Sequence, residues 1–167
     1  MAYPNWLKTA LTYIGTKEIK GRKHNPVILG WWKKIKVNWV KTDEVPNCAA
    51  FIGNCFEEVG IRSTRSGRAQ SYAKSPHFKK IKAPVVGCVV VFERGAKGSG
   101  KGHVIFGMGR DKRGRIVGVG ANHSDTTSIK PFKTSRVIGY YWPVVEKIKD
   151  YSFPLVKDYG KASTNER

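Results

Sequence analysis

The sequence has little negative charge and few cysteines, and it contains no long hydrophobic run. Only 12 of its 167 residues are Asp or Glu, against 31 Lys and Arg, which gives a formal net charge of +19. The three cysteines are an odd number without a C-x-x-C pair, which argues against a disulfide framework and a zinc ribbon. No segment approaches the roughly 18 apolar residues of a membrane span, and the N-terminus lacks the pattern of a signal peptide. We therefore expect a protein without a membrane span that is made in the cytoplasm.

The excess of positive charge indicates a polyanionic partner, because a surface of this sign concentrates polyanions around it. Composition alone puts nucleic acid first. Cell-wall glycans with acidic stem peptides and teichoic acids, and anionic lipid, are the other candidates. A basic nucleic-acid-binding module without catalysis is therefore the alternative to an enzyme. Against it, no nucleic-acid-binding motif is present, and most aromatic residues fall in apolar patterns rather than among the basic ones.

The first 60 residues have the periodicity of helices. Residues 5–15, 26–35 and 48–59 each carry apolar side chains at three- and four-residue spacing. Asn47 is the expected N-cap of the third helix, and Pro26 suits the first turn of the second. The sequence therefore predicts three amphipathic helices before any strand.

The second half of the chain is rich in β-branched and aromatic residues. We expect strands over residues 85–92, 103–110, 115–120 and 136–142. Helices followed by an antiparallel sheet are typical of the α+β class. We expect one domain over residues 1–146 and a polar, loosely held C-terminal tail over residues 147–167.

Cys48 differs from the other two cysteines in its position. It is expected at the first turn of a helix, where unpaired N–H groups and the helix dipole favour the thiolate, the nucleophilic form of cysteine. Cys55 lies mid-helix on the apolar face and Cys88 lies within a valine-rich strand, so both are predicted to be core residues. Cys48 is the candidate nucleophile, with a packing role as the alternative.

Of the four histidines, His103 is the candidate base for such a nucleophile. It follows the glycine-rich loop 94–102 and begins an apolar strand, which would hold it rigidly at a cleft. His24 and His77 lie in polar, basic segments typical of the surface. His123 lies in a polar turn, and its role stays open.

A catalytic histidine needs a neighbour that fixes its tautomer. If the turn 111–114 pairs Arg110 with Arg115, the ladder places Asn122 opposite His103. Opposed residues share a face, with Cβ atoms about 5 Å apart. We therefore expect the Asn122 side-chain oxygen to accept a hydrogen bond from the His103 ring. An odd loop length, or a bulge near the glycines of the second strand, would change the facing.

Several short blocks of the sequence follow one another in a characteristic order. They are Gly15-Thr16-Lys17-Glu18 with His24-Asn25-Pro26, then Asn47-Cys48-Ala49-Ala50-Phe51, Gly102-His103-Val104, Gly120-Ala121-Asn122 and Gly139-Tyr140-Tyr141-Trp142-Pro143. In this order they resemble small phage-type lysins of the CHAP and NlpC-like cysteine peptidase superfamily. The resemblance covers about residues 5–143.

The resemblance implies a papain-like α+β fold of the NlpC/CHAP type, with N-terminal helices packed on a C-terminal antiparallel sheet. It implies cleavage of an amide bond of bacterial peptidoglycan by Cys48 as nucleophile, His103 as base and Asn122 as third polar residue, without a metal or cofactor. The bond would belong to a stem peptide or cross-bridge (an endopeptidase) or join muramic acid to L-alanine (an amidase).

A phage endolysin of this kind would act as a monomer on peptidoglycan and anionic cell-envelope polymers, after release from the host cytoplasm. The chain departs from the family pattern at Asn47, where the family usually has Trp, and at Ala121 and His123, where it usually has Gly and Gln. These changes concern substrate contacts. The sequence leaves open the bond cut, the target species, calcium dependence, the roles of Glu18 and His123, and whether the protein is a lysis enzyme, a virion-borne enzyme or a toxin.

Overall fold

The computed structural model describes residues 2–21, 23–43 and 45–166. Its helices are α1 (Asn5–Thr12), α2 (Pro26–Lys34) and α3 (Cys48–Glu58), with short 3-10 turns η1 (Ala69–Ala73) and η2 (Thr134–Arg136). Its strands are β1 (Phe78–Ile81), β2 (Val89–Glu93), β3 (Gly102–Arg110), β4 (Ile116–His123), β5 (Thr126–Phe132) and β6 (Val137–Pro143). The strands form one antiparallel sheet in the order β1-β6-β2-β3-β4-β5, so the α+β class is confirmed.

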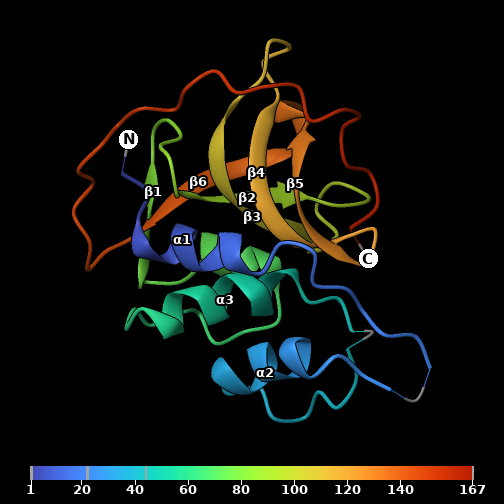
Figure 1. Cartoon of the computed structure of the whole chain (residues 1–167). Helices are drawn as coiled ribbons and strands as arrows, with labels where there is room; N and C mark the ends of the chain where they lie inside the picture. The colour runs from blue at the N-terminus through green and yellow to red at the C-terminus, as the bar shows by residue number, and fades with distance from the viewer. Residues whose placement is uncertain (1, 22, 44, 167) are drawn as a thin grey trace.

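The helices lie together beside the sheet, and α3 is the central one (Figure 1). It packs on β3 and β4 and lies between α1 and α2 (Figure 1). Its residues from Cys48 to Phe56 are all buried, because α3 is covered on every side. Phe51 and Phe56 join it to Phe106 of β3, with ring centroids 6.5 and 5.3 Å apart. The first residue of α3 is thereby fixed against the middle of the sheet.

The three predicted helices are confirmed, although the first ends at Thr12 rather than near Gly15, and Asn47 precedes α3 without a side-chain capping hydrogen bond. The Asn25 side chain accepts a hydrogen bond from the Val27 N–H at 2.9 Å, which caps α2. Gly60 follows α3 at a φ of 80°, a conformation that glycine adopts without strain. Among the described residues no helix has the length and apolar character to cross a bilayer.

The sheet contains two strands that the sequence did not indicate, β1 and β5. Both lie at sheet edges, where one side of the strand has no neighbour. Their sequences, FKKI and TTSIKPF, carry lysine or proline, as edge strands commonly do, and so lack a clear apolar alternation. The central strands were predicted because their residues are buried on both faces.

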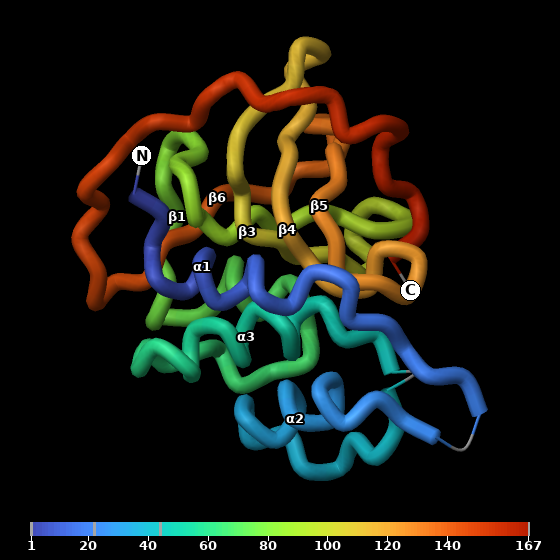
Figure 2. Tube along the Cα trace, in the orientation of Figure 1, coloured from blue at the N-terminus to red at the C-terminus, as the bar shows by residue number. Residues whose placement is uncertain are grey.

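The C-terminal segment 147–167, expected to be a loosely held tail, forms backbone hydrogen bonds with the sheet in its described part. The segment crosses the sheet and continues past β5 (Figure 2). Backbone hydrogen bonds join Arg110 to Pro154 and to Val156 at 2.9 and 2.8 Å. Gly109 lets the segment approach, since a Cβ there would meet the Pro154 carbonyl. The segment thus belongs to the folded structure and ends beside α3.

Candidate active site

Cys48 is the first residue of α3, and its side chain is almost fully buried between the helix and β3. The residue is 5% exposed. Burial raises the pKa of the thiol to about 11, although hydrogen bonds from the Val104 and Ala49 N–H groups act in the opposite direction. The expected stabilisation of the thiolate is therefore wrong for the resting protein, because desolvation outweighs the helix terminus. Cys48 rests as a neutral thiol beside the strand residue that follows His103.

His103 is fully buried near the start of β3, and it contacts a second histidine. Its Nε2 lies 2.8 Å from Nε2 of His123, and its ring stacks on Phe132 with centroids 5.4 Å apart. Burial, and then the nearby charges of His123, Arg136 and Arg94, hold the pKa of His103 well below its usual value. His103 is therefore a neutral imidazole at rest, and the lowered pKa makes it a weaker base than an exposed histidine.

The register between β3 and β4 explains which residue reaches His103. Arg110 pairs with Ile116 rather than Arg115, because the connecting loop has one residue more than expected. A register shift between Gly107 and Gly109 compensates, so Phe106 again pairs with Val119. In the middle of β3 and β4, side chains therefore face the sides of the sheet that the sequence predicted.

A second irregularity then separates Asn122 from His103. The pairing of β4 with β5 shifts between Gly120 and His123, and Asn122 has a φ of 66° in the left-handed region. The Asn122 Nδ2 donates to the Glu166 carbonyl at 2.6 Å, and its Oδ1 has no partner within the described part of the chain. The hydrogen bond expected between Asn122 and the His103 ring is therefore not formed.

His123 takes the position that Asn122 was expected to fill. Gly120 makes room for it, since a Cβ at Gly120 would lie 3.0 Å from the His123 Nε2. The sequence places His123 in a polar turn and leaves its role open. The signals that could have identified it are the glycine at 120 and the asparagine at 122, a residue type that tolerates the left-handed conformation.

The two histidines and Ser128 form a chain of hydrogen-bonding groups with one consistent protonation. The His123 Nδ1 lies 3.2 Å from Oγ of Ser128. Burial, with the charge of Lys130, lowers the pKa of His123 to about 3, so both rings are neutral. If the His103 Nε2–H donates to His123, the His103 Nδ1 keeps its lone pair, and His123 donates its Nδ1–H to Ser128. The alternative would leave a buried Nδ1–H on His103 without an acceptor among the described residues.

Cys48 lines a cavity of about 370 Å³ whose other walls are strongly basic. It is lined by Pro46, Cys48, Gly67, Arg68, Ala69, Arg94, Ser99, Gly100, Lys101, Gly102 and Glu166. Four residues in or next to this region bear buried polar atoms without a hydrogen-bond partner in the described chain: Asn47 Oδ1, Arg94 Nε, His103 Nδ1 and Asn122 Oδ1. Buried polar atoms in folded proteins usually have a partner, and a bound substrate would supply one to Nε of Arg94, which lines the cavity.

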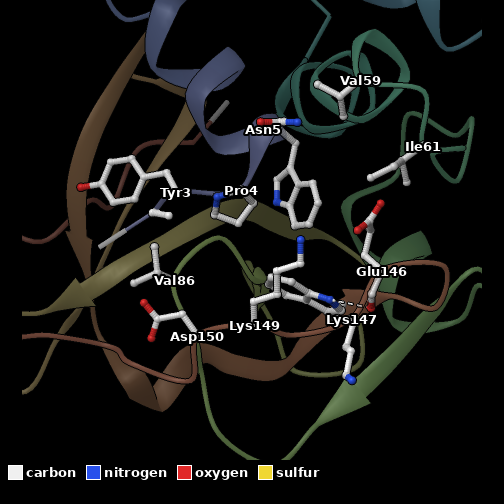
Figure 3. Close-up of a pocket in the computed structure, with 13 residues that line it drawn as sticks. Tyr3, Pro4, Asn5, Val59, Ile61, Val86, Glu146, Lys147, Lys149 and Asp150 are labelled. Atoms are coloured by element: carbon white, nitrogen blue, oxygen red, sulfur yellow. Dashed lines mark hydrogen bonds between the residues drawn. The ribbon is translucent and has the colours of Figure 1, made fainter.

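A second cavity, of about 380 Å³, lies between the start of α1 and the segment after β6 (Figure 3). Glu146, Lys147, Lys149 and Asp150 surround it on one side and Pro4 on the other. It shares no lining residue with the Cys48 cavity and contains neither cysteine nor histidine. We therefore take the Cys48 cavity as the candidate active site.

The block containing His24 contributes to structure at a different place. The buried Asp43 accepts hydrogen bonds from the Ile19 and Asn25 N–H groups at 2.7 and 2.6 Å, and lies 3.1 Å from the His24 Nδ1. Burial alone would raise the pKa of Asp43, but these bonds outweigh it and lower the pKa. This network holds the loop before α2. No set of three His, Cys, Asp or Glu side chains in the described ranges could hold a metal ion.

Comparison of the chain with protein-family models and with curated proteins finds no match, so the functional assignment rests on the site itself and on the resemblance in sequence.

Proposed function

We propose that the protein is a papain-like cysteine hydrolase that cleaves an amide bond of bacterial peptidoglycan. The observation that carries the proposal is that the first residue of α3 packs on the strand that carries His103, and that His103 contacts a second histidine. Cys48 begins α3 with its sulfur hydrogen-bonded by the Val104 N–H, the adjacent residue His103 is a neutral base, and His123 binds the far nitrogen of His103. A nucleophile, a base and a group that orients the base are the minimum for this chemistry.

The first half of the reaction transfers the acyl group to sulfur. The Cys48 sulfur attacks the amide carbonyl carbon while its proton passes to Nδ1 of His103, a contact that substrate binding must close because no hydrogen bond joins the two groups at rest. His123 stabilises the resulting His103 imidazolium, because its own Nε2 accepts a hydrogen bond from the Nε2–H of His103. As the first residue of α3, Cys48 has a backbone N–H without an acceptor inside the helix, and this N–H stabilises the oxyanion. The C–N bond then breaks, and His103 returns the proton to the leaving amine.

The second half releases the acyl group as a carboxylic acid. Water gives a proton to Nδ1 of His103 and attacks the thioester carbon. The C–S bond breaks, and the proton returns to the sulfur of Cys48. Cys48 starts and ends as a neutral thiol, so His103 must act as a general base during the attack, and substrate binding must narrow the gap between the high pKa of the thiol and the low pKa of His103.

Peptidoglycan as the substrate is supported by the resemblance in sequence and by charge. Arg68, Arg94 and Lys101 line the Cys48 cavity, and the whole chain carries +19. Stem peptides and wall polymers are acidic, so a basic site concentrates them. Nucleic acid has the same charge, but it has no carboxamide bond in its backbone for such a site to cut.

The test is to incubate the protein with purified peptidoglycan and to measure new amino groups and new reducing ends separately. We expect amino groups to appear without reducing ends, and mass spectrometry of the fragments to identify the amide that was cut. New reducing ends without amino groups, or the release of neither, would rule out the proposal.

A further inference from the structure

Glu166 is the unusual member of the Cys48 cavity, because it is an acidic side chain buried on a very basic protein. Its side chain is 1% exposed, and its carboxylate forms an ion pair with the Arg136 guanidinium. Its main-chain carbonyl accepts the hydrogen bond from Asn122. Glutamate is almost never fully buried unless it is paired, so this position is built to hold a carboxylate.

Arg136 is fixed independently of Glu166. Its Nε donates to the Glu93 carbonyl at 3.1 Å, and its guanidinium lies 5.9 Å from the centre of the Phe92 ring. A guanidinium held at one edge by the backbone and over an aromatic face presents its remaining N–H groups in a fixed direction. The carboxylate-binding group therefore exists before any ligand arrives.

Arg94 supplies a second cation with an unused donor. It lines the same cavity as Cys48 and Glu166, and its buried Nε has no hydrogen-bond partner within the described part of the chain. Its charge acts on both Cys48 and His103. A buried guanidinium N–H without an acceptor is costly, and an oxygen of a bound ligand would satisfy it.

We propose that Arg136 and Arg94 form a carboxylate subsite beside Cys48, which selects peptides that carry a free acidic side chain close to the cleaved amide. Glu166 fills this subsite in the free protein and stands in for that acidic side chain. The inference rests on the proposed function for its link to cleavage, but the subsite itself concerns binding alone.

The segment that carries Glu166 resembles a bound peptide in the way it is held. Backbone and side-chain hydrogen bonds fix residues 163–166: Ser124 N–H to the Asn165 carbonyl at 2.9 Å, and Arg136 Nη1 to the Ser163 carbonyl at 3.3 Å. The Ser163 N–H also donates to the Pro131 carbonyl at 2.8 Å, and Asn122 donates to the Glu166 carbonyl, so the segment is held along its length as a bound peptide would be. A substrate carboxylate competes with Glu166 for Arg136, and its apparent affinity is reduced by the fraction of molecules in which Glu166 is bound.

The experiment measures binding by calorimetry in a Cys48→Ala background, so that no cleavage occurs. The probes are a soluble stem peptide with a free side-chain carboxylate and the same peptide with that carboxylate amidated. We expect the acidic peptide to bind about tenfold to a hundredfold more tightly than its amide, as a charged hydrogen-bonded pair provides. Arg136→Gln should abolish this preference, and Glu166→Gln should tighten binding of the acidic peptide.

Arg110→Gln is the matched control, because the Arg110 guanidinium also lies over a phenylalanine ring, that of Phe153, at 5.8 Å. Arg110 is the last residue of β3, at the end of the strand opposite to His103. It should leave the preference unchanged. Equal binding of the two peptides, or equal effects of Arg136→Gln and Arg110→Gln, would overturn the subsite. If Arg136→Gln unfolds the chain, the effect of Glu166→Gln decides, and weaker or unchanged binding of the acidic peptide contradicts the proposal. Failure of the parent protein to cut any wall would instead refute the proposed function.

Discussion

Replacing His123 by leucine should strongly reduce turnover while leaving substrate binding nearly unchanged. The substitution removes the acceptor that lies 2.8 Å from Nε2 of His103. His103 then loses the group that fixes its tautomer, and we expect kcat to fall by about 10²- to 10⁴-fold, the usual contribution of a positioned acid–base group. KM should change little, because His123 lies behind His103 and does not line the cavity.

The same substitution has a cost in stability that can be worked out from its surroundings. Leucine fills much of the space against Phe132, whose ring centroid lies 5.1 Å from that of His123. The buried N–H of His103 is left without a partner, which costs about 1–3 kcal/mol in the free energy of unfolding. Urea unfolding measures this loss, and the variant should remain folded during the assay.

Two further variants separate positioning from simple packing. His123→Gln can still accept a hydrogen bond and should restore part of kcat, which a purely structural role would not require. Asn122→Gly suits the φ of 66° and should keep kcat, since Asn122 binds Glu166 rather than His103. If Asn122→Gly lost activity and His123→Leu kept it, Asn122 would be the orienting residue and our reasoning would be wrong.

Three other predictions follow from burial and charge. Cys55→Ala and Cys88→Ala should each lower the free energy of unfolding by about 1 kcal/mol or more through small cavities, measured in urea, yet keep wall-lysing activity, because both thiols are fully buried in the core. His123 titrates near pH 3 in the folded protein and near 6.5 when unfolded. His123 alone should thus leave stability complete above about pH 6.5 and lower it by about 1.4 kcal/mol per pH unit between about pH 6.5 and 3, and His103, whose pKa is also lowered, should steepen the fall; a flat profile would contradict the burial of neutral histidines. Added salt should slow lysis of whole cells far more than cleavage of a soluble muropeptide, since salt screens the attraction between the basic protein and the anionic cell surface. Equal slowing of both reactions by salt would show that the positive charge does not serve attachment to the cell surface.

Local patterns in the sequence predicted the helices, and they placed Cys48 at the start of α3 and His103 near the start of β3. Apolar periodicity and the residues at the helix ends define α3, and with it the position of Cys48. His103 was predicted from the loop before it and the apolar strand after it. These signals lie within a few residues of one another, so they can be recognised in a single sequence without knowledge of the tertiary structure.

The partner of His103 could not be predicted, because it depends on register over a whole hairpin. A longer loop and a shift between Gly107 and Gly109 cancel, and a further shift before His123 then turns Asn122 away. Each change flips the facing of every later side chain. The position of Glu166 near Cys48 could not be predicted for another reason. It depends on how the C-terminal segment crosses the sheet.

The most direct test of the account is the rate of amine release from purified peptidoglycan by Cys48→Ala, with Cys55→Ala as the matched control. Both changes remove one buried sulfur from the same helix, and circular dichroism shows whether each variant is folded. We predict that Cys55→Ala releases amines at a rate close to that of the parent and that folded Cys48→Ala releases none above the protein-free blank. Release by folded Cys48→Ala at the parent rate would contradict the mechanism.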